Sequence, residues 1–512
     1  MNYADLFRVT LPETALEIAA LVVLVADLAF LRKSALRARG AVAVVLGVAG
    51  CAAAFFLMLG QGTQTFCATG SAETALLSTG GLIAVAQSGI LVLTALTLLL
   101  LIDSAFTRNP GEYVAVALMS AVGGLIISGA QDLLVIFIGL ELLSLGLYVL
   151  TAFAKQSGRS AEAALKYYLF GGMSAAFLLF GFSYLYGLTG STNLNQVVIG
   201  SITSAGSGSP LFYVALVLIA AGLGFKVAAV PFHLWAPDAY EGAPAPAAAF
   251  IASVSKVASF ALLITIGTAA AHPLAGLHLN GRFAVRAVSG PSPVIHGFGI
   301  EWPLILSVLA VASMVVGNLA ALAQTSVRRL LAYSAIAHAG YMLLALAYPT
   351  QSPRSNEALL YYILTYGLTT VGAFGVVGVV ERATGSDKLD AFLGLQKRNP
   401  LLAAVLLILL LSLAGIPPLV GFWAKFNLFA AVLAANAGAV PFALVALAVG
   451  MSAVSLYYYL QVLKRAYVMP APPDLCCIDV HPVTALLLAF IAAAVLVMGC
   501  MPAVLQSWIA GL

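Results

Sequence analysis

The chain has 512 residues, of which 62% are hydrophobic and only 8% are charged, and its mean hydropathy is +1.06. Soluble domains carry about 25% charged residues, so this composition excludes a soluble fold and predicts a polytopic membrane protein. The formal net charge is +4, and the basic residues sit in short connections without forming a stripe. This pattern excludes a nucleic-acid-binding surface.

The cysteines do not have the spacing of a metal or cluster site. None of them forms a C-x-x-C pair or a C-x-x-C-H haem motif. We therefore expect no metal and no cofactor in this chain, and we interpret the cysteines as small apolar residues. The five are Cys51, Cys67, Cys476, Cys477 and Cys500.

Long apolar runs alternate with short polar connections, which predicts an all-α integral membrane protein. The first run is followed by Arg32, Lys33, Arg37 and Arg39, whereas a cleavable signal peptide carries its charges in front and a small-residue cleavage site behind, so we interpret the run as a retained span. About fourteen spans are predicted, near 12–31, 40–59, 78–102, 112–129, 132–153, 164–188, 211–230, 244–270, 302–323, 329–348, 358–380, 400–436, 440–463 and 483–503.

The basic residues agree with this number of spans, because membrane proteins keep Lys and Arg mainly on the inside. With the N-terminus outside, the inside connections hold fifteen of the 23 basic residues, and the outside connections hold Arg8, Arg282, Arg286 and Arg354. Fourteen spans then place both termini on the periplasmic side of a bacterial inner membrane.

The four remaining basic residues are lysines inside predicted spans: Lys166, Lys226, Lys256 and Lys425. A lysine at the centre of a membrane helix costs about 2.5–3.5 kcal/mol, and such residues usually mark an ion or proton path. Glu141, in "LLVIFIGLELLSLGLYVL", is the one carboxylate deep in a central span. A structural ion pair is the alternative, but four lysines and one glutamate leave an excess of positive charge. We therefore predict proton-transfer sites.

Two predicted spans are too long for the bilayer. Residues 211–242 and 400–436 would be about 48 and 55 Å long as single helices, against a hydrocarbon core of about 30 Å. Each contains prolines and a lysine, in "GFKVAAVPFHLWAPDAYEGAPAP" and "GIPPLVGFWAKF". Lys226 precedes the proline break in its span, whereas Lys425 follows the proline break in its span. The two spans cross the membrane in opposite directions. This arrangement is typical of an inverted repeat with ion sites at broken helices. The alternative to broken helices is that the prolines form ordinary kinks. If the helices are broken, their freed backbone groups need water or polar partners, which predicts a hydrated cavity.

Two histidines join the candidate set. His338 lies within the tenth predicted span, and His233 lies beside the first proline break. Histidine changes its charge near neutral pH and can carry protons, although a single buried histidine is more often a packing residue. Asp238 and Glu241 follow the same break, where they could control access of water. We assign no role to Glu17 or Asp27.

Several motifs in order resemble the antiporter-like membrane subunits of respiratory complex I, the NADH-quinone oxidoreductase. They include "PFHLWAPDAYEGAPAPAAAFIASVSKVASF", "ALKYYLFGGMSAAFLLFGFSYLYGLTG", "GNLAALAQTSVRRLLAYSAIAHAGYMLL" and "GIPPLVGFWAKF". The resemblance covers roughly residues 110–465 and is nearest to the branch of subunit N. Subunit M has a glutamate where Lys425 stands, and subunit L continues into a long lateral helix.

The resemblance implies fourteen helices, with helices 4–8 and 9–13 as inverted repeats and helices 7 and 12 discontinuous. It implies that Glu141 and Lys226 form a pair in the first half-channel, that Lys256 is the central relay, and that Lys425 lies towards the second half-channel. Lys166 resembles a lysine that the family carries in helix 6, near the broken helix. His338 and His233 remain secondary candidates.

These patterns divide the chain into five parts. Residues 1–110 form an N-terminal three-helix segment, and 111–271 form the first antiporter-like repeat. An external connection, 272–301, leads to the second repeat, 302–465. Residues 466–512 contain helix 14.

The resemblance implies a translocase subunit that moves protons while electrons move elsewhere. The chain has no G-x-G-x-x-G loop, P-loop or cluster motif, so NADH, FMN, iron–sulfur clusters and quinone are expected in partner subunits. The expected partners are other membrane subunits of complex I and the lipid bilayer. The alternatives are a subunit of a multi-subunit cation/proton antiporter of the same fold, and a membrane scaffold. The scaffold does not explain the lysines.

Overall fold

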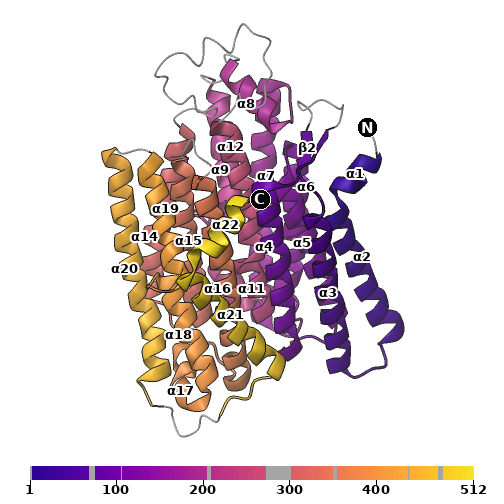
Figure 1. Cartoon of the computed structure of the whole chain (residues 1–512), viewed down its shortest axis with the longest axis vertical. Coiled ribbons are helices and arrows are strands. Elements are labelled where there is room, and N and C mark those ends of the chain that lie inside the picture. The colour runs from indigo at the N-terminus through magenta and orange to yellow at the C-terminus, as the bar shows by residue number, and fades with distance from the viewer. Residues whose placement is uncertain are drawn as a thin grey trace.

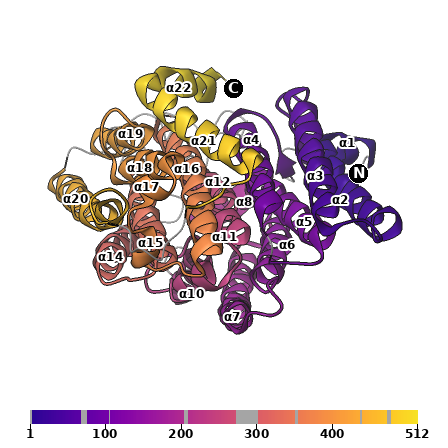
Figure 2. The same ribbon diagram turned by 90° about the horizontal axis from the view of Figure 1, so that it is seen from below.

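The computed structural model describes residues 3–67, 75–104, 106–203, 209–271, 301–349, 354–435, 438–470 and 477–511. Its helices stand side by side in an elongated bundle (Figure 1). Seen along the helices, the bundle extends from α2 and α3 at one end to α20 at the other (Figure 2). Twelve helices of the described part are long and apolar enough to cross a membrane.

The bundle begins with a small group of helices and one hairpin. The predicted first span is α2 continued by the π-helical turn η1, and the third is α4 continued by the 3-10 turn η3. The elements are α1 (Tyr3–Val9), α2 (Leu11–Val25), η1 (Ala26–Phe30), α3 (Leu36–Leu59), β1 (Thr65–Cys67), β2 (Ala75–Ser78), α4 (Gly81–Leu99) and η3 (Leu100–Asp103).

The next elements form the first repeat, in which the seventh predicted span is interrupted between α9 and α10. The eighth span is also divided, because the helix stops at Ala252 and resumes at Val254. The elements are α5 (Pro110–Gly129), α6 (Leu133–Thr151), α7 (Gly158–Thr189), α8 (Leu194–Thr203), α9 (Pro210–Val227), α10 (Trp235–Gly242), α11 (Ala245–Ala252) and α12 (Val254–Ala271).

The second repeat has the same sequence of helices, with its interruption between α18 and α19. Two further helices end the described chain. The elements are α14 (Glu301–Leu322), α15 (Val327–Ala347), α16 (Arg354–Thr384), η5 (Leu389–Phe392), α17 (Leu395–Arg398), α18 (Pro400–Ala414), α19 (Val420–Ala435), α20 (Ala439–Tyr467), α21 (Pro482–Cys500) and α22 (Pro502–Gly511).

One backbone feature makes the correspondence between the repeats specific. Asp132, just before α6, forms an isolated bridge with Asn193, and Ser326, just before α15, forms one with Lys388. The first bridge adjoins β2 and the second adjoins α17, and these two elements lie at opposite ends of the bundle (Figure 1). The predicted inverted repeats are therefore confirmed.

The side chains at these bridges are exchanged between the repeats. In the first repeat, the Thr192 hydroxyl donates to the Asp132 carboxylate at 2.5 Å, whereas in the second the Ser326 hydroxyl donates to the Asp387 carboxylate. Asp132 and Ser326 also cap their helices by accepting backbone N–H groups. Both repeats thus have a hydrogen bond between a carboxylate and a hydroxyl at this bridge. The carboxylate precedes the helix in the first repeat, and the hydroxyl precedes it in the second.

Both predicted helix breaks are present. Residues 228–234 separate α9 from α10, and residues 415–419 separate α18 from α19. Ala228 adopts a left-handed conformation with φ of 58°, and Gly415 does so with φ of 89°. Such residues end a helix and leave its last carbonyl groups without partners inside it.

Two features differ from the sequence-based expectation. The fold is not purely helical, because β1 and β2 form an antiparallel hairpin where no strand was predicted. The helix after Met501 leaves the fourteenth span as α22 and contacts α16. The predicted external connection lies, apart from its last residue, outside the described residues.

Candidate functional site

Lys226 sits at the last turn of α9, immediately before the first helix break. Its residue surface is only 7% exposed. The ammonium group donates a hydrogen bond to the Ser144 hydroxyl of α6 and lies 5.5 Å from the centre of the Phe225 ring. The lysine predicted from the long, interrupted span is therefore buried, with a hydroxyl as its hydrogen-bond partner.

Glu141 lies one helical turn before Ser144 on α6 and is half-buried. Among the described residues, no ion pair joins it to Lys226. The two groups are therefore not in direct contact in this conformation, and their pairing in the first half-channel stays a prediction. Ser144, one turn further along α6, accepts the hydrogen bond of the Lys226 ammonium group instead.

Lys256 lies in α12, at the centre of the molecule, and is 2% exposed. Its ammonium group donates to the carbonyl oxygen of Val227 at 3.1 Å and to that of Ala335 at 2.9 Å. The first acceptor belongs to the interrupted end of α9, where carbonyl groups lack helical partners and the helix dipole favours a cation. The second belongs to α15, so Lys256 connects the two repeats.

Lys425 occupies a matching place at the second break. It is 6% exposed, and its ammonium group donates to the carbonyl oxygens of Leu413 and Ala414, at 3.0 and 2.9 Å. These carbonyls form the interrupted end of α18. A third hydrogen bond, of 2.7 Å, goes to the Ser452 hydroxyl of α20.

His338 lies on α15, one turn after the carbonyl that Lys256 contacts. Its Nδ1 is 2.7 Å from the Tyr362 hydroxyl of α16, and its Nε2 has no hydrogen-bond partner among the described residues. His338 and Lys425 line the same cavity, of about 10 Å³. That volume has room for about one water molecule.

Four of these residues are linked by a series of contacts from the first repeat to the second. We call Lys226, Lys256, His338 and Lys425 the lysine row. Along it, Lys256 contacts the backbone of the residue after Lys226, His338 follows the Ala335 carbonyl by one turn, and a small cavity separates His338 from Lys425. Titratable side chains thus succeed one another through both repeats.

A set of tyrosines and polar side chains surrounds the second half of the row and was not predicted. The Asn318 side chain donates to the Tyr341 hydroxyl at 3.0 Å and accepts from Tyr458 at 3.1 Å, and the Ser334 and Tyr459 hydroxyls are hydrogen-bonded. The tyrosines within apolar helices are a sequence signal for such a set, because a buried tyrosine hydroxyl needs a hydrogen-bond partner.

Lys166 differs from the other three lysines. Its side chain is 41% exposed and forms ion pairs with Glu162 of the same helix, at 2.7 Å, and with Asp238 of α10, at 2.9 Å. It lies near the broken helix, as expected from the family resemblance, but its interpretation as a deeply buried lysine is wrong. Lys166 lies in the first half of α7 (Gly158–Thr189) and reaches Glu162 and Asp238 at the polar end of the bundle.

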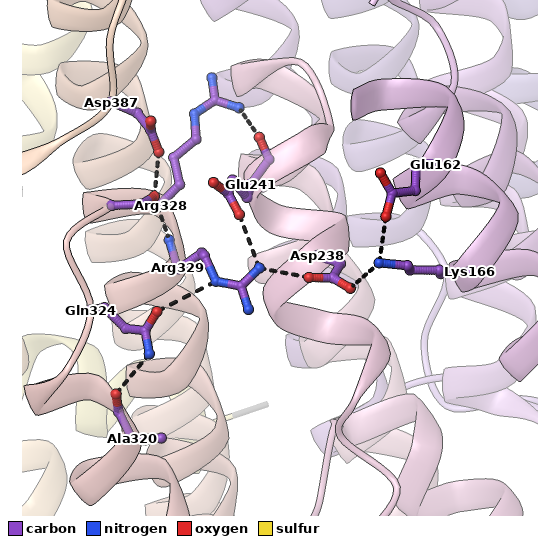
Figure 3. A network of polar contacts seen from close by, with 10 residues as sticks. Glu162, Lys166, Asp238, Glu241, Ala320, Gln324, Arg328, Arg329 and Asp387 are labelled. Carbon is purple, nitrogen blue, oxygen red and sulfur yellow. Dashed lines mark hydrogen bonds and ion pairs between the residues drawn. The ribbon is translucent and has the colours of Figure 1, made fainter. Parts of the chain in front are cut away.

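An ion-pair network holds α10 between α7 and α15 (Figure 3). Arg329 of α15 pairs with Asp238 at 2.6 Å and with Glu241 at 2.9 Å, and Asp238 also pairs with Lys166. We call these four residues, together with Glu162, the α10 network. Arg329 was interpreted from sequence only as a topology signal.

The remaining candidates have separate places. His233 is buried in the first break. Among the described residues, its Nδ1 has no hydrogen-bond partner, and no hydrogen bond joins His233 to the lysine row. Asp27 is paired with Arg39 through two hydrogen bonds of 2.7 and 2.8 Å, which links η1 to α3. Among the described residues, no cluster of three His, Cys, Asp or Glu could hold a metal ion.

The family model of the membrane domain shared by NADH:quinone oxidoreductase and Mrp antiporters matches residues 130–278 and 281–452. NADH-quinone oxidoreductase subunit N 2 of Acidobacterium capsulatum is 46% identical over 99% of both chains. The chain belongs to the subunit N family of NADH-quinone oxidoreductase. A subunit N family member is thus expected to share its fold with solved complex I chains.

Solved structures bear this out. A chain of respiratory complex I from Thermus thermophilus superposes with a TM-score of 0.75 at 32% identity, over 97% of this chain and 98% of that one. A chain of the Mrp complex from Dietzia superposes with a TM-score of 0.77 at only 21% identity, over 99% of this chain and 96% of that one. The fold alone therefore does not separate pump subunits from antiporter subunits, whereas the sequence identity places this chain with subunit N.

Proposed function

We propose that this subunit N family member translocates protons across the membrane as part of an NADH:quinone oxidoreductase. The observation that carries the proposal is the lysine row, which extends through both repeats. Redox chemistry belongs to partner subunits, which supply the NADH, FMN, iron–sulfur and quinone sites. The free energy released by the redox reaction reaches this chain through conformational or electrostatic coupling to the partner subunits.

The surroundings of the lysines support proton transfer more than a structural role. A structural buried cation is normally paired with an anion, because desolvation makes an unpaired charge costly. None of the ion pairs among the described residues includes Lys226, Lys256 or Lys425. Their partners are carbonyl and hydroxyl oxygens, which accept hydrogen bonds from a charged ammonium or from a neutral amine. Such a site can therefore lose and regain a proton without losing its partners.

The proposed sequence of transfers begins at Glu141. Its charge acts on Lys226 across one helical turn of α6, so a change at Glu141 alters how strongly the ammonium form of Lys226 is favoured. The proton then passes to Lys256, to His338 and to Lys425, and leaves on the outside. Moving one proton against 100 mV costs about 2.3 kcal/mol, so each transfer has to overcome only a part of that work.

The proposed topology places both termini outside, in a bacterial inner membrane. The inside then corresponds to the lower end of the bundle in Figure 1, where α17 lies. We also propose that the chain is divided into five parts, at residues 1–110, 111–271, 272–301, 302–465 and 466–512. Neighbouring membrane subunits are the proposed partners, and the half-buried Glu141 on α6 is where a neighbour could act on the lysine row.

A direct test replaces Lys226 by alanine in the assembled complex. We expect NADH-driven proton transport by reconstituted vesicles to fall, because the first ammonium of the row is gone. Lys464→Ala is the matched control, since Lys464 is exposed at the end of α20. Undiminished proton transport by an intact Lys226→Ala complex removes Lys226 from the mechanism.

Membership of an antiporter complex is the competing function, and co-purification separates the two. An NADH-oxidising assembly that contains this chain supports the proposal. Recovery only with small membrane subunits, together with cation-dependent proton exchange in vesicles, contradicts it.

A further inference from the structure

Asn318 of α14 lies beside the second half of the lysine row and is completely buried. Its side-chain nitrogen donates to the Met314 carbonyl oxygen at 2.8 Å and to the Tyr341 hydroxyl of α15 at 3.0 Å. Its side-chain oxygen accepts a hydrogen bond of 3.1 Å from the Tyr458 hydroxyl of α20. One amide group thus joins three helices of the second repeat.

The hydrogen bonds of Asn318 belong to a cluster that we call the tyrosine branch. The Tyr458 and Tyr459 ring centres are 4.5 Å apart, and the Tyr459 hydroxyl is hydrogen-bonded to that of Ser334. Ser334 directly precedes Ala335, whose carbonyl oxygen accepts a hydrogen bond from Lys256. One end of the branch therefore lies beside the Lys256 contact. The members of the branch are Ser334, Tyr459, Tyr458, Asn318 and Tyr341.

Tyr341 brings the other end of the branch to the lysine row. Its ring centre lies 5.4 Å from the Lys425 ammonium nitrogen and 5.7 Å from the centre of the His338 ring. The branch thus extends from the Lys256 contact to Lys425, in parallel with the step of the row that His338 occupies. It provides a second set of polar side chains between the same two lysines.

The orientation of the Asn318 amide is determined by its partners. A carbonyl oxygen only accepts hydrogen bonds, so the group that faces Met314 has to be the amide nitrogen, and the same group faces Tyr341. The Tyr341 hydroxyl therefore accepts from Asn318, while Tyr458 donates to the amide oxygen. A reversed amide would place two acceptors opposite each other.

An amide in this position cannot pass a proton along the branch. A hydroxyl can do so, because the same oxygen accepts one proton and releases another. The Asn318 amide would have to accept a proton on its oxygen and release one from its nitrogen, which leaves an imidic acid, a high-energy tautomer. A carboxylic acid accepts on one oxygen and releases from the other, and it is the same acid afterwards. Asparagine therefore interrupts the branch where aspartic acid would continue it.

We infer that Asn318 is a positioning residue that insulates the tyrosine branch. It holds the Tyr341 ring against Lys425 and His338, and it blocks proton transfer between the Tyr458 and Tyr341 hydroxyls. Protons that pass from Lys256 to Lys425 are thereby confined to His338. The inference rests on the proposed proton translocation and adds the residue that determines the route through the second repeat.

The test asks whether a carboxylic acid at position 318 opens a route around His338. The complete complex is prepared with His338→Phe alone, and with His338→Phe combined with Asn318→Asp or with Asn318→Leu. The measurement is the number of protons transported per NADH oxidised in reconstituted vesicles. We expect a lower number for His338→Phe and no recovery with Asn318→Leu, the control of similar size that neither accepts nor donates.

We expect Asn318→Asp to recover about half or more of the protons per NADH that His338→Phe loses, because a positioned proton-transfer group accelerates a transfer by about 10²–10⁴-fold. A merely structural Asn318 predicts no recovery, since a buried carboxyl group can only weaken the contacts that tie the three helices. Absence of recovery in an intact complex therefore overturns the inference. Undiminished transport by His338→Phe alone also overturns it, because protons then cross without His338 while the amide is in place.

A second pair of variants replaces the first if the aspartate variant does not assemble. Asn318→Thr and Asn318→Val, each combined with His338→Phe, have nearly the same shape, and only threonine carries a hydroxyl. Recovery limited to Asn318→Thr supports the inference, and equal transport by the two overturns it. Absence of proton transport by the complex of native sequence contradicts the proposed function instead, so the two failures are distinguishable.

Discussion

Lys425 donates two hydrogen bonds to carbonyl oxygens that an uninterrupted α18 would have used itself, and Lys256 donates one to the Val227 carbonyl oxygen at the end of α9. At the scale of residues, each helix break thus provides acceptors and a favourable helix dipole, worth about 0.3–1 kcal/mol at exposed sites and more when buried. This interaction offsets part of the cost of burying an ammonium group without forming an ion pair. The breaks and the lysines therefore depend on each other.

His338 gives a residue-scale prediction. Replacing Tyr362 by phenylalanine removes the hydroxyl that holds His338 Nδ1, a hydrogen bond worth about 0.5–1.5 kcal/mol. We expect slower proton transport and a lower thermal unfolding temperature of the complex's membrane part. Tyr361→Phe is the control on the same helix, because the Tyr361 hydroxyl has no partner among the described residues. Equal behaviour of the two variants would contradict a role for the Tyr362 contact.

At the scale of elements, α10 is a half-helix of eight residues whose position depends on its neighbours. Arg329 of α15 and Lys166 of α7 hold it from two sides through Asp238. Arg329 makes two ion pairs and is 29% exposed, whereas Lys166 is 41% exposed and its contribution is reduced by solvent. The clamp is therefore stronger on the side of the second repeat.

Amide hydrogen exchange tests the clamp. Arg329→Gln is expected to speed exchange in residues 235–242, because α10 then opens locally more often. Lys166→Gln is expected to have a smaller effect, since Asp238 keeps its partner Arg329. The idea of an asymmetric clamp fails if the Lys166 variant exchanges as fast as the Arg329 variant.

The sequence was informative wherever one segment carried its own signal. Length, proline and an interior lysine together predicted both breaks, and the burial of Lys226 and Lys425 follows from their place beside them. The Arg329–Asp238 pair could not be predicted, because the partners are ninety-one residues apart and a basic residue at the end of a span looks like a topology signal. The contact of Ser144 with Lys226 was missed because a serine in an apolar span has many possible partners.

At the scale of the whole molecule, the two most buried spans lie where the repeats meet. In the most apolar stretch of the α11–α12 span, and in that of α15, 94% of the residues are buried, against 22% for α20. These spans carry Lys256 and His338, so the centre of the lysine row is screened from lipid by the rest of the bundle. On the proposed route, a proton that crosses from one repeat to the other passes this centre.

Lys256→Met in the complete complex tests this crossing most directly. Methionine has a similar length, and replacing a buried charge by an apolar side chain need not destabilise the protein, so assembly should persist. The measurement is the number of protons transported per NADH oxidised in reconstituted vesicles, with Lys464→Met as control. We predict a lower number for Lys256→Met and an unchanged one for Lys464→Met. An unchanged number in an intact Lys256→Met complex would contradict proton transfer along the lysine row.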